Sequence, residues 1–263
     1  MVTNQCVDAE RYGSVVDSIT EFYRRNGHRR QHALLELIPA ITQHAAVNRE
    51  YNRLTSAEIN LFRFFAPGET THSRLLAFFL NPRSQHGQGG LFLEEFLKVL
   101  GIRQPQCGAG HTWTVTAEQG RIDVLLKRAH PHAVVVIENK SNYAVDQPHQ
   151  LYRYWYREIH RQQVSRHRSA EEIAQPPKDS YRMVYLAPAA WKRPDEQSMR
   201  KPKEWERLTW AAHLPEVIPM EPEQHLFPDL VVQWLSNALP RLPVDNHRLR
   251  EFTLQYLQFW KAH

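Results

Sequence analysis

Apolar residues recur every three or four positions through much of the first hundred residues, which is the spacing of one face of a helix. They predict a helix over residues 15–23 that stops at Gly27, and a second over residues 34–41 that Pro39 would kink or begin. The chain is therefore expected to open with helices.

Three more helices are predicted before residue 101. Thr55 and Glu58 have the spacing of a capping box, in which each side chain accepts from the other residue's backbone N–H, ahead of an apolar run over residues 59–65. Residues 75–80 and 91–100 predict two further apolar helices, and the loop between them is rich in glycine.

The period of the pattern changes to two after residue 111, which indicates strands. Residues 112–116 and 122–126 alternate, and residues 133–137 form a continuous apolar run typical of a strand buried on both faces. A fourth strand is predicted over residues 183–186.

Helices and polar stretches make up the rest of the pattern. Pro148 should open a helix that runs to about residue 161, and residues 227–239 and 248–260 predict two more. Residues 165–180 and 192–206 carry many charges and few apolar side chains, so they predict exposed loops. The order of elements predicts an α/β core inside a helical frame.

Composition narrows the class of protein. The 263 residues carry 33 Lys and Arg against 28 Asp and Glu, a formal charge of +5, and 42% of them are hydrophobic. That fraction is too high for a disordered chain, and no run reaches the roughly 18 apolar residues of a membrane-spanning helix. Two cysteines without a CxxC spacing exclude a disulfide scaffold and a cysteine-based zinc site. Because no apolar leader is seen, we expect a cytoplasmic location.

The clearest chemistry lies on two neighbouring predicted strands. Asp123 lies within an apolar strand, where an unpaired carboxylate is costly to bury, and Glu138 and Lys140 end the most apolar strand of the chain. Residues two apart on a strand point to one face, so Glu138 and Lys140 would project together, away from the Asn139 side chain. Antiparallel pairing of the strands would bring Asp123 to the same place.

Two carboxylates at such a place suit Mg²⁺, which prefers oxygen ligands and keeps several waters. A neighbouring lysine could orient a water molecule and offset the charge that develops during phosphodiester hydrolysis. The alternative is a structural salt bridge of Glu138 with Lys140 or Asp123, which would bury three ionisable groups without a chemical use.

This arrangement resembles the PD-(D/E)xK nuclease superfamily, whose signature is an acid in one strand and acid-x-Lys at the end of the next. Here the signature reads Ile122-Asp123 and Glu138-Asn139-Lys140, with Ile122 in place of the usual proline. The chain resembles a bacterial and phage branch in particular, over about residues 56–215. The motifs that carry this closer likeness are Glu69-Thr70-Thr71-His72-Ser73, Asn81-Pro82, Gln85-His86-Gly87-Gln88-Gly89, Asp146-Gln147-Pro148-His149-Gln150-Leu151 with Tyr154, and Leu186-Ala187-Pro188.

The resemblance implies a restriction-endonuclease-like α/β fold, in which helices flank a mixed four-stranded sheet. We expect a helical extension over residues 1–55, the nuclease core over residues 56–215 and a second helical extension over residues 216–263. All three should form one compact domain.

The resemblance also implies roles for the residues of the signature. Asp123, Glu138 and the backbone carbonyl of Asn139 would hold Mg²⁺ or Mn²⁺, and Lys140 would position the attacking water. Gln150, on the following helix, would support the metal's water or a substrate phosphate, unless it is an ordinary exposed residue.

An upstream helix supplies a further acid in this superfamily. Glu69 matches that acid and would be an additional metal ligand, although Glu94 and Glu95 also precede the sheet on a helix. Alternatively, Glu69 interacts only with the positive end of its own helix. His72 could mark a metal-binding helix with Glu69, or it could orient the wall of the site.

Other residues are candidates for contact with nucleic acid. Basic residues recur at three- and four-residue steps on this helix, at Arg153, Arg157, His160 and Arg161. They form either a stripe suited to phosphates or an ordinary solvated face. Tyr154 could stack on a base of the substrate. His72 and Ser73 are further candidates, and the loop around His86 could cradle phosphate or be plain surface.

Together these features predict a metal-dependent nuclease, with DNA the expected substrate and phage defence or mobile-element biology the expected setting. A homodimer or a partner protein from a defence system is compatible with this prediction. The main alternative is a non-catalytic nucleic-acid-binding subunit of the same fold, which would have no reason to retain the three charged groups. A hydrolase or transferase for a small phosphorylated molecule is a third, but no phosphate-binding loop supports it.

Overall fold

A computed structural model describes residues 5–56, 58–103, 112–166, 169 and 177–262. Its contacts divide the chain into two compact units, one up to Ile59 and one from Asn60 onward. None of the helices in the described part is both long enough and apolar enough to cross a membrane.

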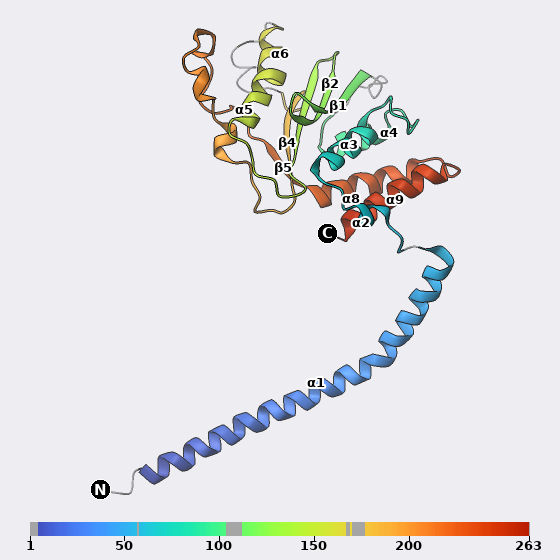
Figure 1. Cartoon of the computed structure of the whole chain (residues 1–263), viewed down its shortest axis with the longest axis vertical. Coiled ribbons are helices and arrows are strands. Elements are labelled where there is room, and N and C mark those ends of the chain that lie inside the picture. Colours follow the sequence, from blue (N-terminus) through green and yellow to red (C-terminus); the bar gives the residue numbers. More distant parts are fainter. Residues whose placement is uncertain (1–4, 57, 104–111, 167–168, 170–176, 263) are drawn as a thin grey trace. The chain divides into compact units, whose positions relative to one another are not determined.

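The first unit is a single long helix. α1 runs from Gln5 to Thr55 without a break, so the predicted stop at Gly27 is wrong. Gly27 lacks the positive φ that a helix-ending glycine adopts. Pro39 is accommodated inside the helix, which curves along its length (Figure 1). The two helices expected here are therefore one.

The predicted capping box is also wrong. Thr55 is the last residue of α1, and the next helix, α2 (Leu61–Phe65), is capped by Asn60, whose side chain accepts from the Phe62 N–H over 3.0 Å. Asn60 also donates to the Gln255 carbonyl over 2.7 Å. It thereby fastens the start of the second unit to α9 (His247–Lys261).

A five-stranded sheet of order β1-β2-β3-β4-β5 forms the centre of the second unit. Its strands are β1 (Trp113–Gln119), β2 (Ile122–Arg128), β3 (Ala133–Asn139), β4 (Tyr181–Ala187) and β5 (Glu223–Leu226). The first three pair antiparallel, and β4 and β5 each join in parallel. The expected mixed α/β sheet is confirmed with one strand more, because the four residues of β5 are too few and too polar to show an alternating pattern.

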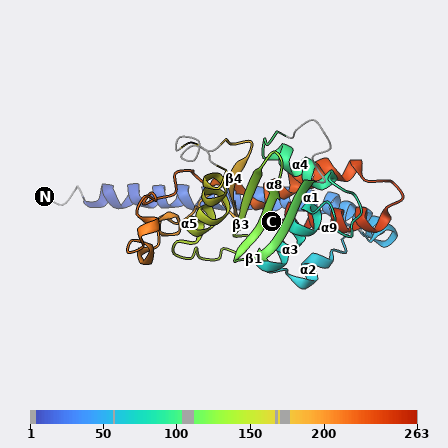
Figure 2. The ribbon, with the colours of Figure 1, turned by 90° about the horizontal axis from the view of Figure 1, so that it is seen from above.

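Helices cover both faces of this sheet (Figure 2). The larger apolar core lies between one face and four helices, namely α9, α3 (Glu69–Leu80), α4 (Leu91–Val99) and α8 (Phe227–Ala238). β3 is buried on both faces, as its apolar run predicted.

The opposite face is covered by one interrupted helix. It begins as α5 (Gln150–Tyr154), passes through a π-helical turn (Trp155–His160) and ends as α6 (Arg161–Val164). Its tyrosines and Trp155 form a smaller apolar core with β3 and β4. The predicted helix is thus confirmed, but its internal change of phase has consequences for the residues on its surface.

The polar stretch 192–206 is not simply an exposed loop. It contains short 3-10 turns at Glu196–Met199 and Lys203–Trp205, and Ser198 and Lys201 lie in the interior. Much of the stretch 165–180 falls outside the described residues. Two further 3-10 turns lie at Thr209–Ala211 and Leu239–Arg241.

Candidate active site

The two strands that carry the signature meet as the sequence predicted. β2 and β3 run antiparallel with Val124 opposite Ile137, so Asp123 comes beside Glu138. The Asn139 backbone N–H donates to Asp123 Oδ2 over 2.6 Å, and Lys140 Nζ lies 2.6 Å from Glu138 Oε1. Three charged groups therefore gather on one face of the sheet, at the ends of two central strands.

The side chain of Asn139 points to the opposite face and ties the site to α3. Its Nδ2 donates to the Glu69 carbonyl and to Ser73 Oγ, each over 3.0 Å, and its Oδ1 accepts from the Ser141 N–H over 3.0 Å. Ser73 Oγ in turn donates to the Glu69 carbonyl over 3.1 Å. The middle residue of Glu138-Asn139-Lys140 thus fixes the first turn of α3 against the end of β3.

This attachment places Glu69 at the site. Burial raises the pKa of the Glu69 carboxyl, while the positive charge of Lys140 opposes the rise. Glu94 and Glu95 instead pair with Arg241, on another part of the unit. Of the three candidate upstream acids, Glu69 is the one that adjoins the signature.

Electrostatics at the site are dominated by burial of the two acids. Burial raises the pKa of Glu138 to about 8 and that of Asp123 to about 7, and the Asp123 charge adds to the rise at Glu138. Burial alone would lower the pKa of Lys140, but the charges of Glu138 and Asp146 outweigh it and raise that pKa. The nearby positive charge is therefore too small to neutralise all the carboxylates of the site.

The oxygens at the site fit a hard divalent cation. Glu138 Oε2 and Glu69 Oε1 are buried and have no hydrogen-bond partner within the described residues. A buried acceptor without a donor costs about 1–3 kcal/mol, and more when it is charged. Oxygens of this kind are the ligands that Mg²⁺ prefers. No three acidic, histidine or cysteine side chains in the described part come close enough to enclose an ion, so a bound Mg²⁺ would keep several waters.

A family model of the PD-(D/E)XK nuclease superfamily matches residues 59–258. The chain belongs to this superfamily. Proteins of the superfamily generally hydrolyse phosphodiester bonds and typically use divalent metals. No match is found among curated proteins or among solved structures. The matched region runs past residue 215 into α9, so it includes the helices that follow the sheet.

A buried carboxylate that sequence reasoning did not select as a site residue also belongs to this candidate site. Asp146 accepts from Tyr185 Oη over 3.0 Å and from the Asp195 N–H over 3.0 Å. Lys140 Nζ lies 3.6 Å from one of its oxygens and Lys192 Nζ lies 3.5 Å from the other. Asp146 thus holds two lysines at the site, and its place four residues before Gln150 was the available signal.

Gln150 and Tyr154 bond to each other beside the site. Gln150 Nε2 donates to Tyr154 Oη over 2.8 Å, and Gln150 Oε1 accepts from the Gln147 N–H over 3.2 Å. The Tyr154 hydroxyl donates to the Arg121 carbonyl, and the residue is 3% exposed. Its ring is packed in the smaller core, so the predicted stacking on a base is wrong, although Tyr154 lines the same hollow as Gln150 and Arg153.

The predicted basic stripe is broken by the π-helical turn. Arg153 and Arg157 line one hollow of about 320 Å³ together with Arg121 and Gln150. The turn changes the phase of the helix, so His160, the last residue of that turn, is buried, and His160 and Arg161 line a separate hollow. The stripe of four is reduced to Arg153 and Arg157, which gain Arg121 as a neighbour.

His72 and Ser73 cannot contact nucleic acid as predicted, because both are buried. His72 Nδ1 lies 3.0 Å from Tyr256 Oη, and its ring centroid is 4.8 Å from that of Trp260. His72 therefore joins α3 to α9. Ser73 serves the site only through its bond to Asn139.

His86 is buried as well, although residues around it in the loop, such as Gln85 and Gly87, are exposed. Its Nε2–H donates to the Phe79 carbonyl over 3.1 Å, and its Nδ1 accepts from the Gln88 N–H over 3.0 Å. One ring nitrogen bonds to α3 and the other to the loop, which leaves neither for a phosphate.

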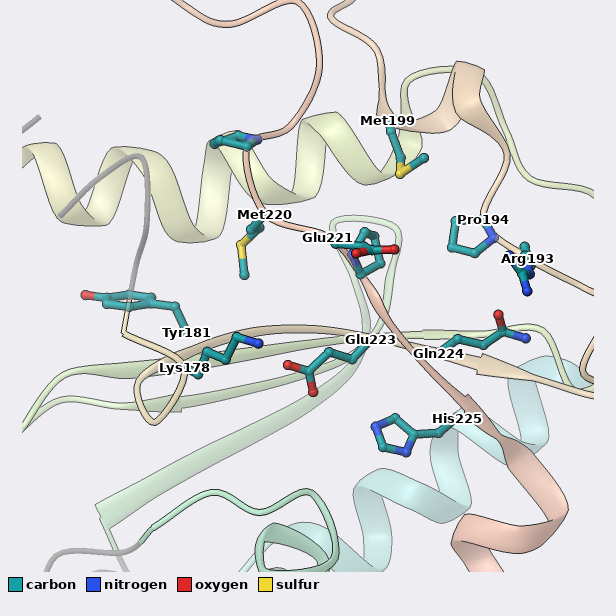
Figure 3. A pocket seen from close by; sticks show the side chains of 12 residues that line it. Lys178, Tyr181, Arg193, Pro194, Met199, Met220, Glu221, Glu223, Gln224 and His225 are labelled. Carbon is teal, nitrogen blue, oxygen red and sulfur yellow. The ribbon is translucent and has the colours of Figure 1, made fainter. Parts of the chain in front are cut away.

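A further hollow of about 930 Å³ lies at the edge strand β5, where Tyr181 and Met220 line it (Figure 3). None of the predicted site residues lines it. Gln224, on its wall, donates to the Ala190 and Lys192 carbonyls over 3.1 and 3.0 Å. One loop therefore joins this hollow to the lysine that contacts Asp146.

Proposed function

We propose that this protein is a Mg²⁺- or Mn²⁺-dependent nuclease that acts on DNA. Asp123, Glu138 and the Asn139 backbone carbonyl would hold the metal, with Glu69 as a further ligand through a water. The observation that carries this proposal is the buried, unsatisfied Glu138 Oε2 beside Lys140. A purely structural ion pair would leave that oxygen without a use.

The reaction would be hydrolysis of a phosphodiester bond by water. A divalent cation bound there would polarise the phosphate and make the attacking water a stronger nucleophile. The Lys140 ammonium, 2.6 Å from Glu138 Oε1, would orient that water and stabilise the negative charge that grows on the phosphate oxygens. Asp146 would keep Lys140 in place and present Lys192 to a neighbouring phosphate.

Binding of the nucleic-acid strand would involve the arginines on the same side of the sheet. Arg121, Arg153 and Arg157 surround the hollow that Gln150 also lines. Arg153 pairs with the exposed Glu204 over 2.8 Å, and exposed pairs of this kind are weak, so a phosphate can replace Glu204. The hollow would therefore hold the backbone next to the cleaved bond.

The setting proposed for this nuclease is defence against phage or mobile-element biology. The support is the likeness of the ordered motifs to a bacterial and phage branch of the superfamily, and it is an argument by analogy.

The test is incubation of the purified protein with linear, circular and single-stranded DNA and with RNA, each with Mg²⁺, Mn²⁺ or EDTA. DNA should be cleaved when either metal is present, and neither EDTA samples nor a Glu138→Gln variant should cleave. Binding without cleavage of any substrate would favour the non-catalytic subunit. Cleavage that persists in EDTA would overturn the metal assignment, and preferential cleavage of RNA would overturn DNA as the substrate.

A further inference from the structure

α1 carries large apolar side chains that its own unit leaves exposed. Tyr23, Leu37, Val47, Tyr51 and Leu54 are each 53–71% exposed. Helices in water derive most of their stability from packing an apolar face rather than from intrinsic propensity. A helix of 51 residues with such a face is therefore expected to have a partner.

Of the nine large apolar residues of α1 that are exposed in the described part, five fall on one heptad repeat, whereas Phe22, Leu35, Ile38 and Ile41 lie off it. Steps of three and four residues alternate through positions 23, 26, 30, 33, 37, 40, 44, 47, 51 and 54, which hold Tyr, Asn, Arg, Ala, Leu, Ala, His, Val, Tyr and Leu. Tyr12, Val16 and Ile19 continue the same steps toward the N-terminus in the sequence. We call this set the seam.

The period of the seam indicates the kind of partner. A straight α-helix drifts by about 20° per heptad relative to a 3.5-residue repeat, so a seam that keeps this repeat stays in contact only with a helix that coils around it. The partner must also be long, because residues 12–54 extend over about 63 Å of helix at 1.5 Å per residue. In the described part of the second unit the longest helix is α9, with 15 residues, or about 22 Å.

We propose that α1 pairs with α1 of a second copy of this chain to form an antiparallel coiled coil. A second copy supplies a helix of the required length and the same repeat. In a parallel pair, Arg30 would face Arg30 and His44 would face His44 at the seam. In the antiparallel pair centred near residue 35, Leu37 lies opposite Ala33, Arg30 opposite Ala40, and His44 opposite Asn26.

The antiparallel arrangement matches side chains by size and by chemistry. Large residues meet small ones in the central layers, and the polar His44 and Asn26 meet each other rather than an apolar residue. Polar pairs at a seam are known to fix register and orientation. The dimer would contain two nuclease units, but its formation requires neither metal nor nucleic acid, so its test is independent of the proposed activity.

The first test is the mass of the full-length protein by light scattering. The monomer is 31.0 kDa, and the wild type should have about twice that mass. Leu37→Glu combined with Tyr51→Glu should reduce the mass to that of the monomer. The matched control is Leu35→Glu with Ile38→Glu, which places the same charges at residues 63% and 52% exposed but off the seam, and it should remain a dimer. A monomeric wild type, or a seam variant that stays dimeric, would overturn the proposal.

A second variant covers the case in which charged residues simply unfold α1. Arg30→Leu with His44→Leu fills two polar seam positions, so it should tighten the dimer and raise a melting temperature that depends on protein concentration. A melting temperature independent of concentration in both proteins would count against self-association through the seam.

Orientation is tested in a Cys6→Ser, Cys107→Ser background. A mixture of Asn26→Cys chains and His44→Cys chains should form the mixed disulfide in preference to either symmetric one. Symmetric disulfides as the main products would mean a parallel pair and would overturn the antiparallel arrangement.

Discussion

Replacing Lys140 by methionine should separate the chemistry proposed for the candidate site from the folding of the protein. Methionine keeps an unbranched apolar stem but removes the ammonium that lies 2.6 Å from Glu138 Oε1 and 3.6 Å from Asp146 Oδ1. Two buried carboxylates would lose their shared cation. The proposed reaction would lose the group that orients the attacking water.

Both effects can be given a size. Breaking a buried ion pair costs about 3–5 kcal/mol when the remaining charge is left unpaired. The lower end is expected here, because burial already raises the pKa of Glu138, so its carboxyl can take up a proton more readily once the ammonium is gone. Asp146 also keeps Lys192 at 3.5 Å. Loss of a positioned charge should slow cleavage by about 10²–10⁴-fold.

Lys201 provides a matched control for this substitution. It is 7% exposed against 5% for Lys140, and it pairs with Glu216 rather than with a carboxylate of the signature. Urea unfolding should show a smaller loss for Lys201→Met than for Lys140→Met, because Glu216 is exposed and keeps its hydration when its partner is removed. Single-turnover cleavage per folded molecule should fall only in Lys140→Met, while its DNA binding in a mobility-shift assay stays near that of the wild type. Wild-type cleavage by Lys140→Met, or an equal loss in Lys201→Met, would refute the role assigned to Lys140.

Three more predictions test other parts of the site and the fold. Asp123→Ala should abolish Mn²⁺ binding measured by calorimetry, and an unchanged affinity would remove Asp123 from the ligand set. Replacing Arg153 and Arg157 together by glutamine should lower the slope of log affinity against log salt by about two, one for each lost phosphate contact, whereas an unchanged slope would make them an ordinary solvated face. Burial lowers the pKa of His86 from its ordinary 6.5. The contribution of the neutral His86 ring to the free energy of unfolding is therefore complete above pH 6.5, and it is lost as the pH falls through the lowered pKa. Between about pH 7 and pH 5, the free energy of unfolding measured with urea should therefore fall less for His86→Gln than for the wild type. Equal decreases would mean that other groups cause the acid sensitivity.

The convergence of the signature could be predicted because it depends on local patterns. The alternation around Asp123 and the apolar run before Glu138 define two strands, and adjacent strands with a short turn pair antiparallel. Strand periodicity then places the side chains of Glu138 and Lys140 on one face of the strand and that of Asn139 on the other. The structure shows that separation, with Lys140 beside Glu138 and Asn139 bonded to Ser73 on the opposite face.

Features that depend on distant contacts could not be predicted in this way. His72 is buried by Tyr256, 184 residues away, and nothing local distinguishes it from an exposed histidine. The π-helical turn adds a residue to one turn of a helix whose sequence reads as regular, so the phase of the basic stripe after Trp155 was misjudged. Among the partners of Asp146, Tyr185 lies in β4 and Asp195 in the segment after it, so the burial of Asp146 depends on contacts about 40–50 residues away in the sequence.

The attachment of α3 to α9 bears on how the protein is made. Asn60 bonds to Gln255, and His72 contacts Tyr256, so the helix that holds Glu69 against Asn139 depends on α9 for its own position. Synthesis at roughly 5–20 residues per second separates His72 from Tyr256 by about 10–40 seconds. A chain still on the ribosome during that interval has its signature strands but no anchored α3. The site proposed for cleavage would therefore remain incomplete until α9 has been synthesised and has packed against α3.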